Sequence, residues 1–320
     1  MTTSSPIVLC PIDFSESSRG ALRYAGTVAA HFRARLIMLT VNDPLLAEAA
    51  DLALGPARLE ADTVAEMKKF YRQAFGSKAN ASAAVEFEVA SGKPAPEILR
   101  ESREHGCALI VMASHGSTDC RKLFFGSTTE RVLRETGIPT LVTPGGDAGP
   151  VDIDDVKKLV RRVLVPVDLT DATPQQVVVA RGLADAFSLP LLLLHVIEPV
   201  RSVVSAHLAL PTVETERRYR VEAELDRVAT VMSAGTKPEA LIAYGEPSEE
   251  IAKVASDRDA GLIVMGLHSS SLVAPRMGSV TYRVLCLAHR LILALPPVAT
   301  VRVRTDVREV DTRTAMPVSQ

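Results

Sequence analysis

The chain has 320 residues, 47% of them hydrophobic, which is enough for two domains of about 150 residues with separate cores. Its 36 basic and 38 acidic side chains nearly cancel, and only 4% of residues are aromatic, so nucleic acid and membrane surfaces are not expected partners. We expect a cytoplasmic protein, because no signal-peptide pattern or membrane-length apolar run occurs and the four cysteines are scattered.

The first part of the chain alternates short apolar runs with helical patterns. Strands are expected at residues 7–13, 35–41, 85–89 and 138–143, with a fourth-in-order strand starting at Leu109. Helices are expected after Ser15, from about Pro56 to Phe75 behind a loop-prone region, and after Pro94. Alternation of this kind implies parallel pairing with right-handed crossovers, and therefore a doubly wound α/β domain.

A phosphate cradle is the most specific local pattern in this part. The strand from Leu109 ends at Ala113 and Gly116, and after nine residues Gly126 and Ser127 open a helix that is expected to end at a Gly137 cap. Ser127 and Glu130 have the S-x-x-E spacing of a capping box. Free backbone N–H groups and the helix dipole would then face an anion.

The spacing G-x2-G-x9-G-S/T after an apolar strand resembles the ATP-binding loop of universal stress proteins, with Ala113 at the first glycine position. The resemblance implies ATP, with Mg²⁺ held mainly by the phosphates and water. It also implies contacts with adenosine, largely through backbone groups. The cofactor-binding residues expected in this part of the chain are Pro11, Asp13, Val41, Ala113, His115, Gly116, Gly126, Ser127 and Thr128, with Thr40 also along the adenine side.

Two of these residues have a second interpretation. Asp13, at the carboxyl end of the first strand, either contacts adenosine or merely caps the next helix. His115 has no carboxylate or nucleophile at the spacing of a triad, so turn packing or a phosphate contact is favoured over acid–base catalysis. The chain has no P-loop and no G-x-G-x-x-G after the first strand, and no H-x-x-x-H or clustered carboxylates to suggest a protein-held metal.

The pattern then repeats. After the linker-like run from Pro144 to Pro150, Asp168 follows Asp13 by 155 residues and Gly278 follows Gly126 by 152. The repeat indicates two tandem five-stranded domains, at residues 1–147 and 161–298, with a linker at 148–160 and a C-terminal extension at 299–320 that begins with alternating residues typical of an edge strand. The second set of cofactor-binding candidates is Asp168, Val196, Gly266, Gly278 and Ser279. Asp168 has the same two interpretations as Asp13.

The two halves differ at the cradle. The first keeps Gly116 but has Ala113, whereas the second has Gly266 but replaces the other glycine with Ser269, next to His268. If that turn requires a positive φ, Ser269 carries a steric cost that Gly116 avoids, so we expect the first half to bind ATP more tightly.

The fifth strands of both halves need covering, and the resemblance implies that they pair with one another in an internal pseudo-dimer, with association of two chains into a homodimer as a further expectation. Three functions remain open: an ATP-binding regulatory protein with little turnover, a stress-related scaffold that has lost nucleotide binding, and a slow ATPase. Ala113 and Ser269 favour the scaffold. The enzyme is disfavoured because the sequence shows no set of catalytic residues at a suitable spacing.

Overall fold

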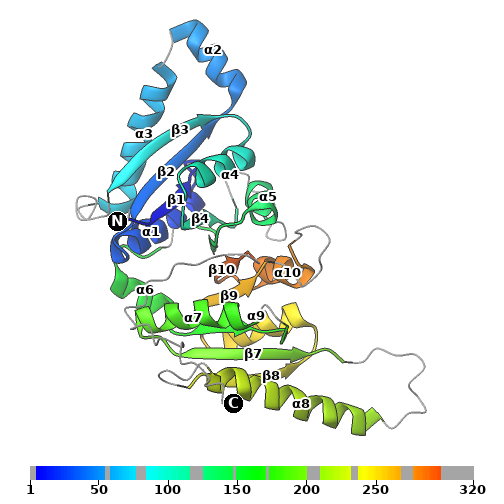
Figure 1. Cartoon of the computed structure of the whole chain (residues 1–320). Coiled ribbons are helices and arrows are strands. Elements are labelled where there is room, and N and C mark those ends of the chain that lie inside the picture. The colour runs from blue at the N-terminus through cyan, green and yellow to red at the C-terminus, as the bar shows by residue number, and fades with distance from the viewer. Residues whose placement is uncertain are drawn as a thin grey trace, which may run out of the picture.

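Figure 1 shows the chain as a computed structural model, which describes residues 5–54, 58–76, 84–115, 125–146, 149–170, 173–199, 210–231, 237–267 and 277–296. The first half contains β1 (Ile7–Pro11), α1 (Glu16–His31), β2 (Arg35–Asn42), α2 (Pro44–Leu54), α3 (Arg58–Phe75), β3 (Val85–Ser91), α4 (Pro94–Glu104), β4 (Leu109–Ala113), α5 (Ser127–Glu135) and β5 (Thr140–Thr143). After α6 (Ile153–Leu159), the second half contains β6 (Val163–Pro166), α7 (Thr173–Phe187), β7 (Leu191–Ile197), α8 (Leu210–Val231), β8 (Glu239–Tyr244), α9 (Pro247–Asp257), β9 (Leu262–Gly266), α10 (Ser279–Leu287) and β10 (Leu291–Leu295).

All ten strands form one sheet, in the order β3-β2-β1-β4-β5-β10-β9-β6-β7-β8. Within each half every pair of neighbouring strands is parallel. The order of the second half mirrors that of the first, so each half has the 3-2-1-4-5 arrangement of a doubly wound fold. The tandem α/β fold expected from the sequence is therefore confirmed.

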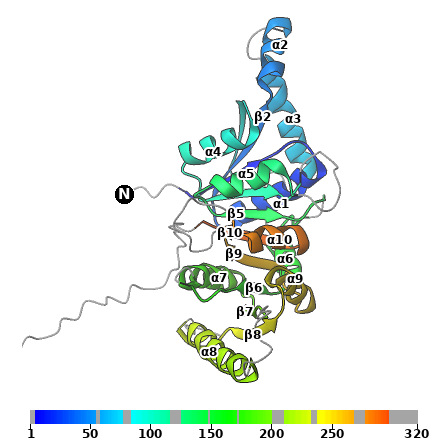
Figure 2. The ribbon, with the colours of Figure 1, turned by 90° about the vertical axis from the view of Figure 1, so that its right-hand side faces the viewer.

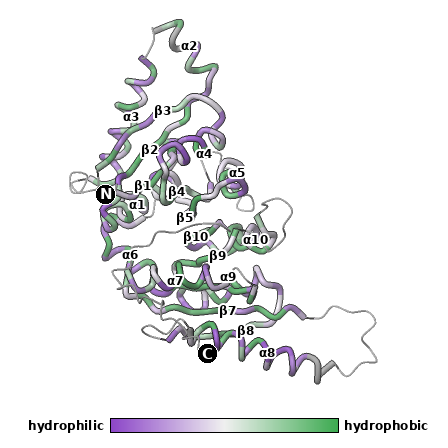
Figure 3. The backbone as a smooth tube through the Cα atoms, viewed as in Figure 1, coloured by the Kyte–Doolittle hydropathy of each residue, from purple (hydrophilic) through white to green (hydrophobic). Residues whose placement is uncertain are grey.

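Helices cover both faces of this sheet, and this explains why inner strands such as β1, β4, β9 and β10 have continuous apolar runs, whereas the outer strand β3 alternates. One face packs against α1, α3, α7 and α8, and the other packs against α4, α5, α9 and α10. Figure 2 shows helices on both sides of the strands, and Figure 3 shows that β7 and β9 are hydrophobic along most of their length. No helix in the described ranges is both long enough and apolar enough to cross a membrane.

The two halves join through their fifth strands. β5 and β10 pair antiparallel, with Val142 opposite Ile292 and Leu141 opposite Leu293. This pairing within one chain is the internal pseudo-dimer expected from the sequence. The other strands of each half run parallel to its fifth strand. The carboxyl ends of the strands in one half therefore point in the opposite direction from those in the other half.

A second junction is formed by α6, which lies within the linker expected at residues 148–160. Val156 and Val160 are buried in the core face that α1 and α7 share. Gly261, just before β9, lies so close to this segment that a Cβ there would be 2.7 Å from Val160 Cα and closer still to the Leu159 carbonyl oxygen. Part of the expected linker is thus a helix packed between the halves.

The ends of α1 and α7 also meet, through aromatic side chains. The His31 ring stacks on Phe187 with centroids 5.0 Å apart and 26° between the ring planes. Phe32 packs against the same Phe187 ring edge-to-face at 5.9 Å. Partial burial and the charge of Lys157 on α6 lower the pKa of His31 below its usual value of 6.5.

The local boundaries differ from the sequence-based expectations in three places. The loop-prone region after Pro44 is instead the helix α2, which extends beyond the sheet together with the adjoining end of α3 (Figure 1). Strand β5 starts at Thr140 rather than Ile138, and α5 ends at a Thr136 C-cap, so Gly137 is not the cap. The expected edge strand at 301–304 and the rest of the C-terminal extension lie outside the described residues.

We expect Gly261→Ala to lower the free energy of unfolding by about 3 kcal/mol, because the added methyl group meets backbone atoms that cannot rotate away. Urea denaturation measures the change. Gly137→Ala is the control, since a Cβ there has no atom within 4 Å, and it should leave stability nearly unchanged or slightly raised. Equal effects of the two substitutions would contradict the close packing of α6 on Gly261.

Acidification should loosen the contact between α1 and α7. Because the folded-state pKa of His31 is lowered, the unfolded chain takes up its proton first, so the stability is complete above the usual imidazole pKa and is lost as pH falls through the folded-state pKa. The urea midpoint of the wild type should therefore fall more than that of His31→Gln between about pH 8 and about pH 5. Parallel losses in the two proteins would show that His31 is not responsible.

Candidate functional site

The candidate site of the first half lies where the strand order reverses direction, between β1 and β4. From β1 the chain continues to β2 on one side, whereas β4 lies on the other. Ligands of open α/β sheets bind outside the carboxyl ends of the strands at such a switch point. Asp13 follows β1 and His115 follows β4, so residues from both sides of the switch point reach the same end of the sheet. β6 and β9 form the corresponding point in the second half.

At the end of β1 the backbone makes an unusual turn. Phe14 has a φ of +61°, and Leu169, at the matching position of the second half, has a φ of +59°. Bulky side chains rarely adopt this left-handed conformation, and strained backbone of this kind gathers at functional sites. The turn is thus preserved in both halves at a local conformational cost.

This turn orients Asp13. Its Oδ1 accepts hydrogen bonds from the Ser15 backbone N–H at 3.1 Å and from the Ser15 hydroxyl at 2.5 Å. Ser15, rather than Asp13, is the N-cap of α1, where its hydroxyl oxygen accepts from the Ser18 N–H at 3.1 Å. The simple capping role considered for Asp13 is therefore filled by Ser15. Asp168 Oδ1 accepts in the same way from the backbone and hydroxyl of Thr170, at 3.1 and 2.7 Å.

Two hydrogen bonds hold the N-terminus of α5 against the end of β4. The Gly126 N–H donates to the Ser114 carbonyl oxygen at 2.9 Å, and the buried Thr129 hydroxyl donates to the Ala113 carbonyl oxygen at 2.9 Å. A Cβ at Gly126 would lie 3.0 Å from the Ser114 oxygen, so a side chain there would force these backbone segments slightly apart. The second half repeats both bonds: Gly278 N–H to the Leu267 oxygen and the Thr281 hydroxyl to the Gly266 oxygen, each at 2.9 Å.

The predicted capping box at the start of α5 is wrong. Gly126 is the N-cap and Ser127 is the first helical residue, so Glu130 stands one position too far along to reach back. Glu130 instead accepts a hydrogen bond from Arg134, one turn further along, at 2.6 Å. Gly126 has no side chain to cap this helix, so among the described residues no side chain accepts from its first backbone N–H groups at the cap.

His115 packs within the turn that follows β4. Its Nδ1 lies 2.9 Å from the Ser114 hydroxyl oxygen, and its ring centroid is 6.4 Å from that of Phe125. A Cβ at Gly145, after β5, would lie 3.9 Å from the same Nδ1. The half-buried ring thus lies beside Ser114 and near Phe125 and Gly145, an arrangement that fits turn packing, and the phosphate contact stays a prediction.

The ends of the second strands differ between the halves. Thr40 donates its hydroxyl to the Ile12 carbonyl oxygen at 3.1 Å. The matching position in the second half is His195, whose Nδ1 lies 2.8 Å from the Val167 carbonyl oxygen. In addition, the Gln176 amide donates to the Pro166 and Val264 carbonyl oxygens at 2.7 and 2.8 Å. The strand ends of the second half are thus covered by larger side chains of its own.

The structure brings most of the predicted site residues together. The carboxyl end of the first half holds Pro11, Asp13, Val41, Ala113, His115, Gly126, Ser127 and Thr128, and that of the second half holds Asp168, Val196, Gly266, Gly278 and Ser279. Gly116, His268 and Ser269 lie outside the described residues, so the comparison of the two glycine turns stays a prediction.

Sequence reasoning missed His195 and Gln176, and it also missed a group formed by Glu88, Glu101 and His105 on β3 and α4. The spacing of Glu101 and His105, four residues apart at the end of a predicted helix, was a readable signal for part of this group. Glu88 precedes Glu101 by 13 residues and belongs to a strand, so no local spacing in the sequence connects it with Glu101 and His105.

The ten-stranded sheet, with one candidate site in each half, defines a tandem, doubly wound α/β protein. The model of the universal stress protein family matches residues 6–144 and 160–294. The chain therefore belongs to the universal stress protein family.

Individual relatives correspond to one half of the chain or to the whole of it. Universal stress protein MJ0577 of Methanocaldococcus jannaschii is 30% identical over 149 residues, which are 42% of this chain and 92% of that protein. Universal stress protein YxiE of Bacillus subtilis is 28% identical over 142 residues, 42% of this chain and 96% of its own. The structure of a universal stress protein from Archaeoglobus fulgidus aligns with 92% of this chain and 100% of its own at a TM-score of 0.64 and 21% identity, which supports the tandem fold.

We expect Thr129→Val to destabilise the first half by about 1 kcal/mol, because it removes only the hydroxyl that ties α5 to the Ala113 carbonyl group. Urea denaturation measures this loss. Thr128→Val makes the same chemical change at the neighbouring half-exposed position and should alter stability by less than about 0.5 kcal/mol. A similar loss in both variants would mean that the hydroxyl of Thr129 does not anchor the helix.

Proposed function

We propose that the chain is an ATP-binding regulatory protein of the stress response, with little or no catalytic turnover. The nucleotide would bind at the carboxyl end of the first half, with its phosphates at the N-terminus of α5 and its adenosine toward Asp13, Pro11 and Val41. Mg²⁺ would be held mainly by the phosphates and water, as is usual for this ion.

The observation that carries this proposal is the glycine N-cap of α5 at the switch point. Gly126 lets the helix approach the Ser114 carbonyl oxygen closely, and it supplies no side chain to cap the helix. The first N–H groups and the positive end of the helix dipole are thereby directed at the place where open α/β sheets bind ligands. The loop spacing resembles the ATP-binding loop of the same family, which favours a nucleotide over another anion.

The differences between the halves support stronger binding by the first. On the adenine side, Thr40 of the first half is replaced by the larger His195, which contacts the Val167 carbonyl group. Gln176 adds hydrogen bonds to the carbonyl oxygens of Pro166, at the end of β6, and of Val264, in the middle of β9. A base approaching the carboxyl end of β7 would have to displace His195, whereas the first half presents the smaller Thr40 there.

Ser127→Asp should weaken ATP binding roughly tenfold or more, because a carboxylate at the first helical position repels the phosphates. The same charge is favourable to the helix, since it lies at the positive end of the dipole, so the fold should be retained. Equilibrium dialysis with ATP and Mg²⁺ measures the affinity. Ser127 is preferred to Gly126 for this test because any side chain at Gly126 meets the Ser114 oxygen.

Ser127→Asn is the matched control, since it has nearly the same shape without the charge and should bind ATP within a few-fold of the wild type. Ser279→Asp makes the same charge change in the second half and should have the smaller effect. A wild-type protein that binds no adenine nucleotide would favour the scaffold function instead. Phosphate release over hours at a rate well above that of a heat-treated sample would favour the slow ATPase.

A further inference from the structure

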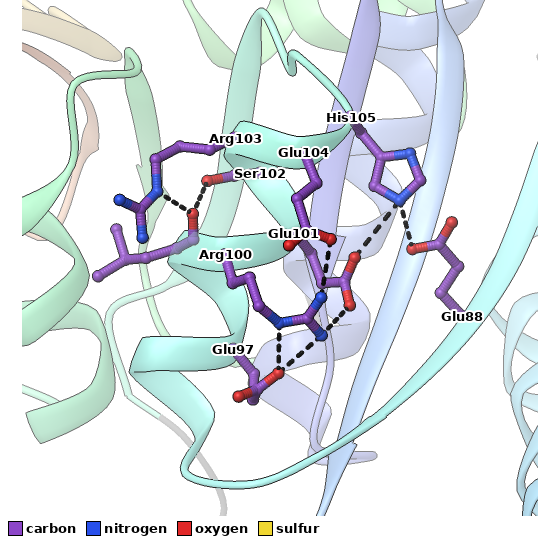
Figure 4. Close-up of polar contacts among 9 residues, drawn as sticks. Glu88, Glu97, Arg100, Glu101, Ser102, Arg103, Glu104 and His105 are labelled. Atoms are coloured by element: carbon purple, nitrogen blue, oxygen red, sulfur yellow. Dashed lines mark hydrogen bonds and ion pairs between the residues drawn. The ribbon is translucent and has the colours of Figure 1, made fainter.

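Three potential metal ligands converge between β3 and α4, at a place distinct from the strand ends described above (Figure 4). His105 Nε2 lies 3.1 Å from Glu88 Oε2 and 3.4 Å from Glu101 Oε2. The three ligand atoms are within 4.8 Å of one another. The side chain of His105 is 30% exposed, that of Glu88 25% and that of Glu101 14%, so all three are half-buried.

These separations suit a shared metal ion. Zinc binds imidazole nitrogen and carboxylate oxygen at about 2.0–2.2 Å, which places two ligands of a tetrahedral ion roughly 3.3–3.5 Å apart. The two distances from His105 Nε2 are close to that value. Two carboxylates and one neutral imidazole also balance the charge of a divalent ion, and this mixed nitrogen and oxygen set suits zinc and similar transition metals.

A neighbouring side chain fixes one of the ligands. Arg100 Nη2 donates to Glu101 Oε1 at 2.5 Å, so Glu101 keeps its other oxygen, Oε2, toward His105 (Figure 4). Arg100 is itself held by Glu97 at 2.9 Å. Hydrogen bonds of this kind to the outer atom of a ligand orient it for a metal.

The electrostatics of the group favour a cation between the carboxylates. Glu88 Oε2 and Glu101 Oε2 both lie beside His105 Nε2, at 3.1 and 3.4 Å. Bringing the carboxylates of Glu88 and Glu101 together in a half-buried place is unfavourable unless a positive charge lies between them. A metal ion would supply twice the charge of a protonated imidazole.

The second half shows what replaces this group when its ligands are missing. The shared glycine turns at Gly92 and Gly245 place Leu241, Val254 and Arg258 at the positions of Glu88, Glu101 and His105. Arg258 forms an ion pair with Glu239 at 2.6 Å, so a fixed cation takes the position of the imidazole. Among the described residues, the ligand set therefore occurs in the first half alone.

We propose that Glu88, Glu101 and His105 bind a divalent transition-metal ion, for which Zn²⁺ is the probe. The metal fastens β3 to α4. Among the described strands, β3 is an outer strand of the sheet and is hydrogen-bonded to β2 alone, so this link secures an edge that backbone pairing holds from one side.

The test uses the full chain, stripped with a chelator and titrated with Zn²⁺ at slightly alkaline pH, with metal content measured after gel filtration. The wild type should bind one more Zn²⁺ per chain than His105→Arg, and the affinity for this ion should fall roughly a hundredfold or more in the variant. Arginine retains a cation beside Glu88 and Glu101, as Arg258 does in the second half, but it cannot ligate. All cysteines are unchanged, so binding to thiols cancels in the comparison.

Glu86→Gln is the control, because it removes an acidic group from the same strand as Glu88, and its carboxylate pairs with Arg35 rather than with a ligand or with Arg100, so its Zn²⁺ affinity should stay within a few-fold of the wild type. If His105→Arg does not fold, Glu88→Gln replaces it, since the amide keeps the shape of the carboxylate and should show the same loss. Excess Zn²⁺ should also raise the thermal midpoint of the wild type and not that of the variant. Equal Zn²⁺ content in the wild type and the folded variant would overturn the proposal and identify the group as an ion-paired imidazolium.

Discussion

The antiparallel pairing of β5 with β10 is the contact on which the rest of the architecture depends. Each half is an open sheet, and its fifth strand would otherwise present an unpaired edge of backbone groups. Joining the two strands removes both edges at once and continues the two helical layers across the junction, so that α1, α6 and α7 share one core face. Because this pairing is antiparallel, the two candidate sites lie at opposite ends of the strands of the same sheet.

Within each half, the candidate site arises from backbone geometry more than from reactive side chains. A left-handed residue after the first strand orients an aspartate, and a glycine at a helix N-cap brings that helix against the fourth strand. Both devices occur in both halves. What differs is the covering of the strand ends, where Gln176 and His195 bond to carbonyl groups of the second half. The two halves therefore share one scaffold and differ in the side chains that bond to these carbonyl groups.

The sequence predicted the features that depend on regular patterns. Uncharged apolar runs identified the parallel strands, and landmarks repeating at nearly constant offsets identified the tandem halves. The S-x-x-E pattern at Ser127 failed because it does not show whether the serine or the preceding glycine is the N-cap. Helix α2 was missed because Leu45 and Leu52 are 75% and 84% exposed, so its apolar residues do not follow the spacing of a buried face. Glu88 could not be linked to Glu101 and His105, because only the packing of α4 on the sheet brings them together.

The covalent link between the halves has a consequence for variation. In a symmetric dimer of one-domain subunits, every substitution appears twice, and both sites must accept it. Here a substitution at one strand end appears once, and the partner strand end across β5 and β10 is unaffected by it. One half can therefore gain a group such as Glu88, Glu101 and His105 while the other keeps Arg258, and every molecule contains one of each at a fixed ratio.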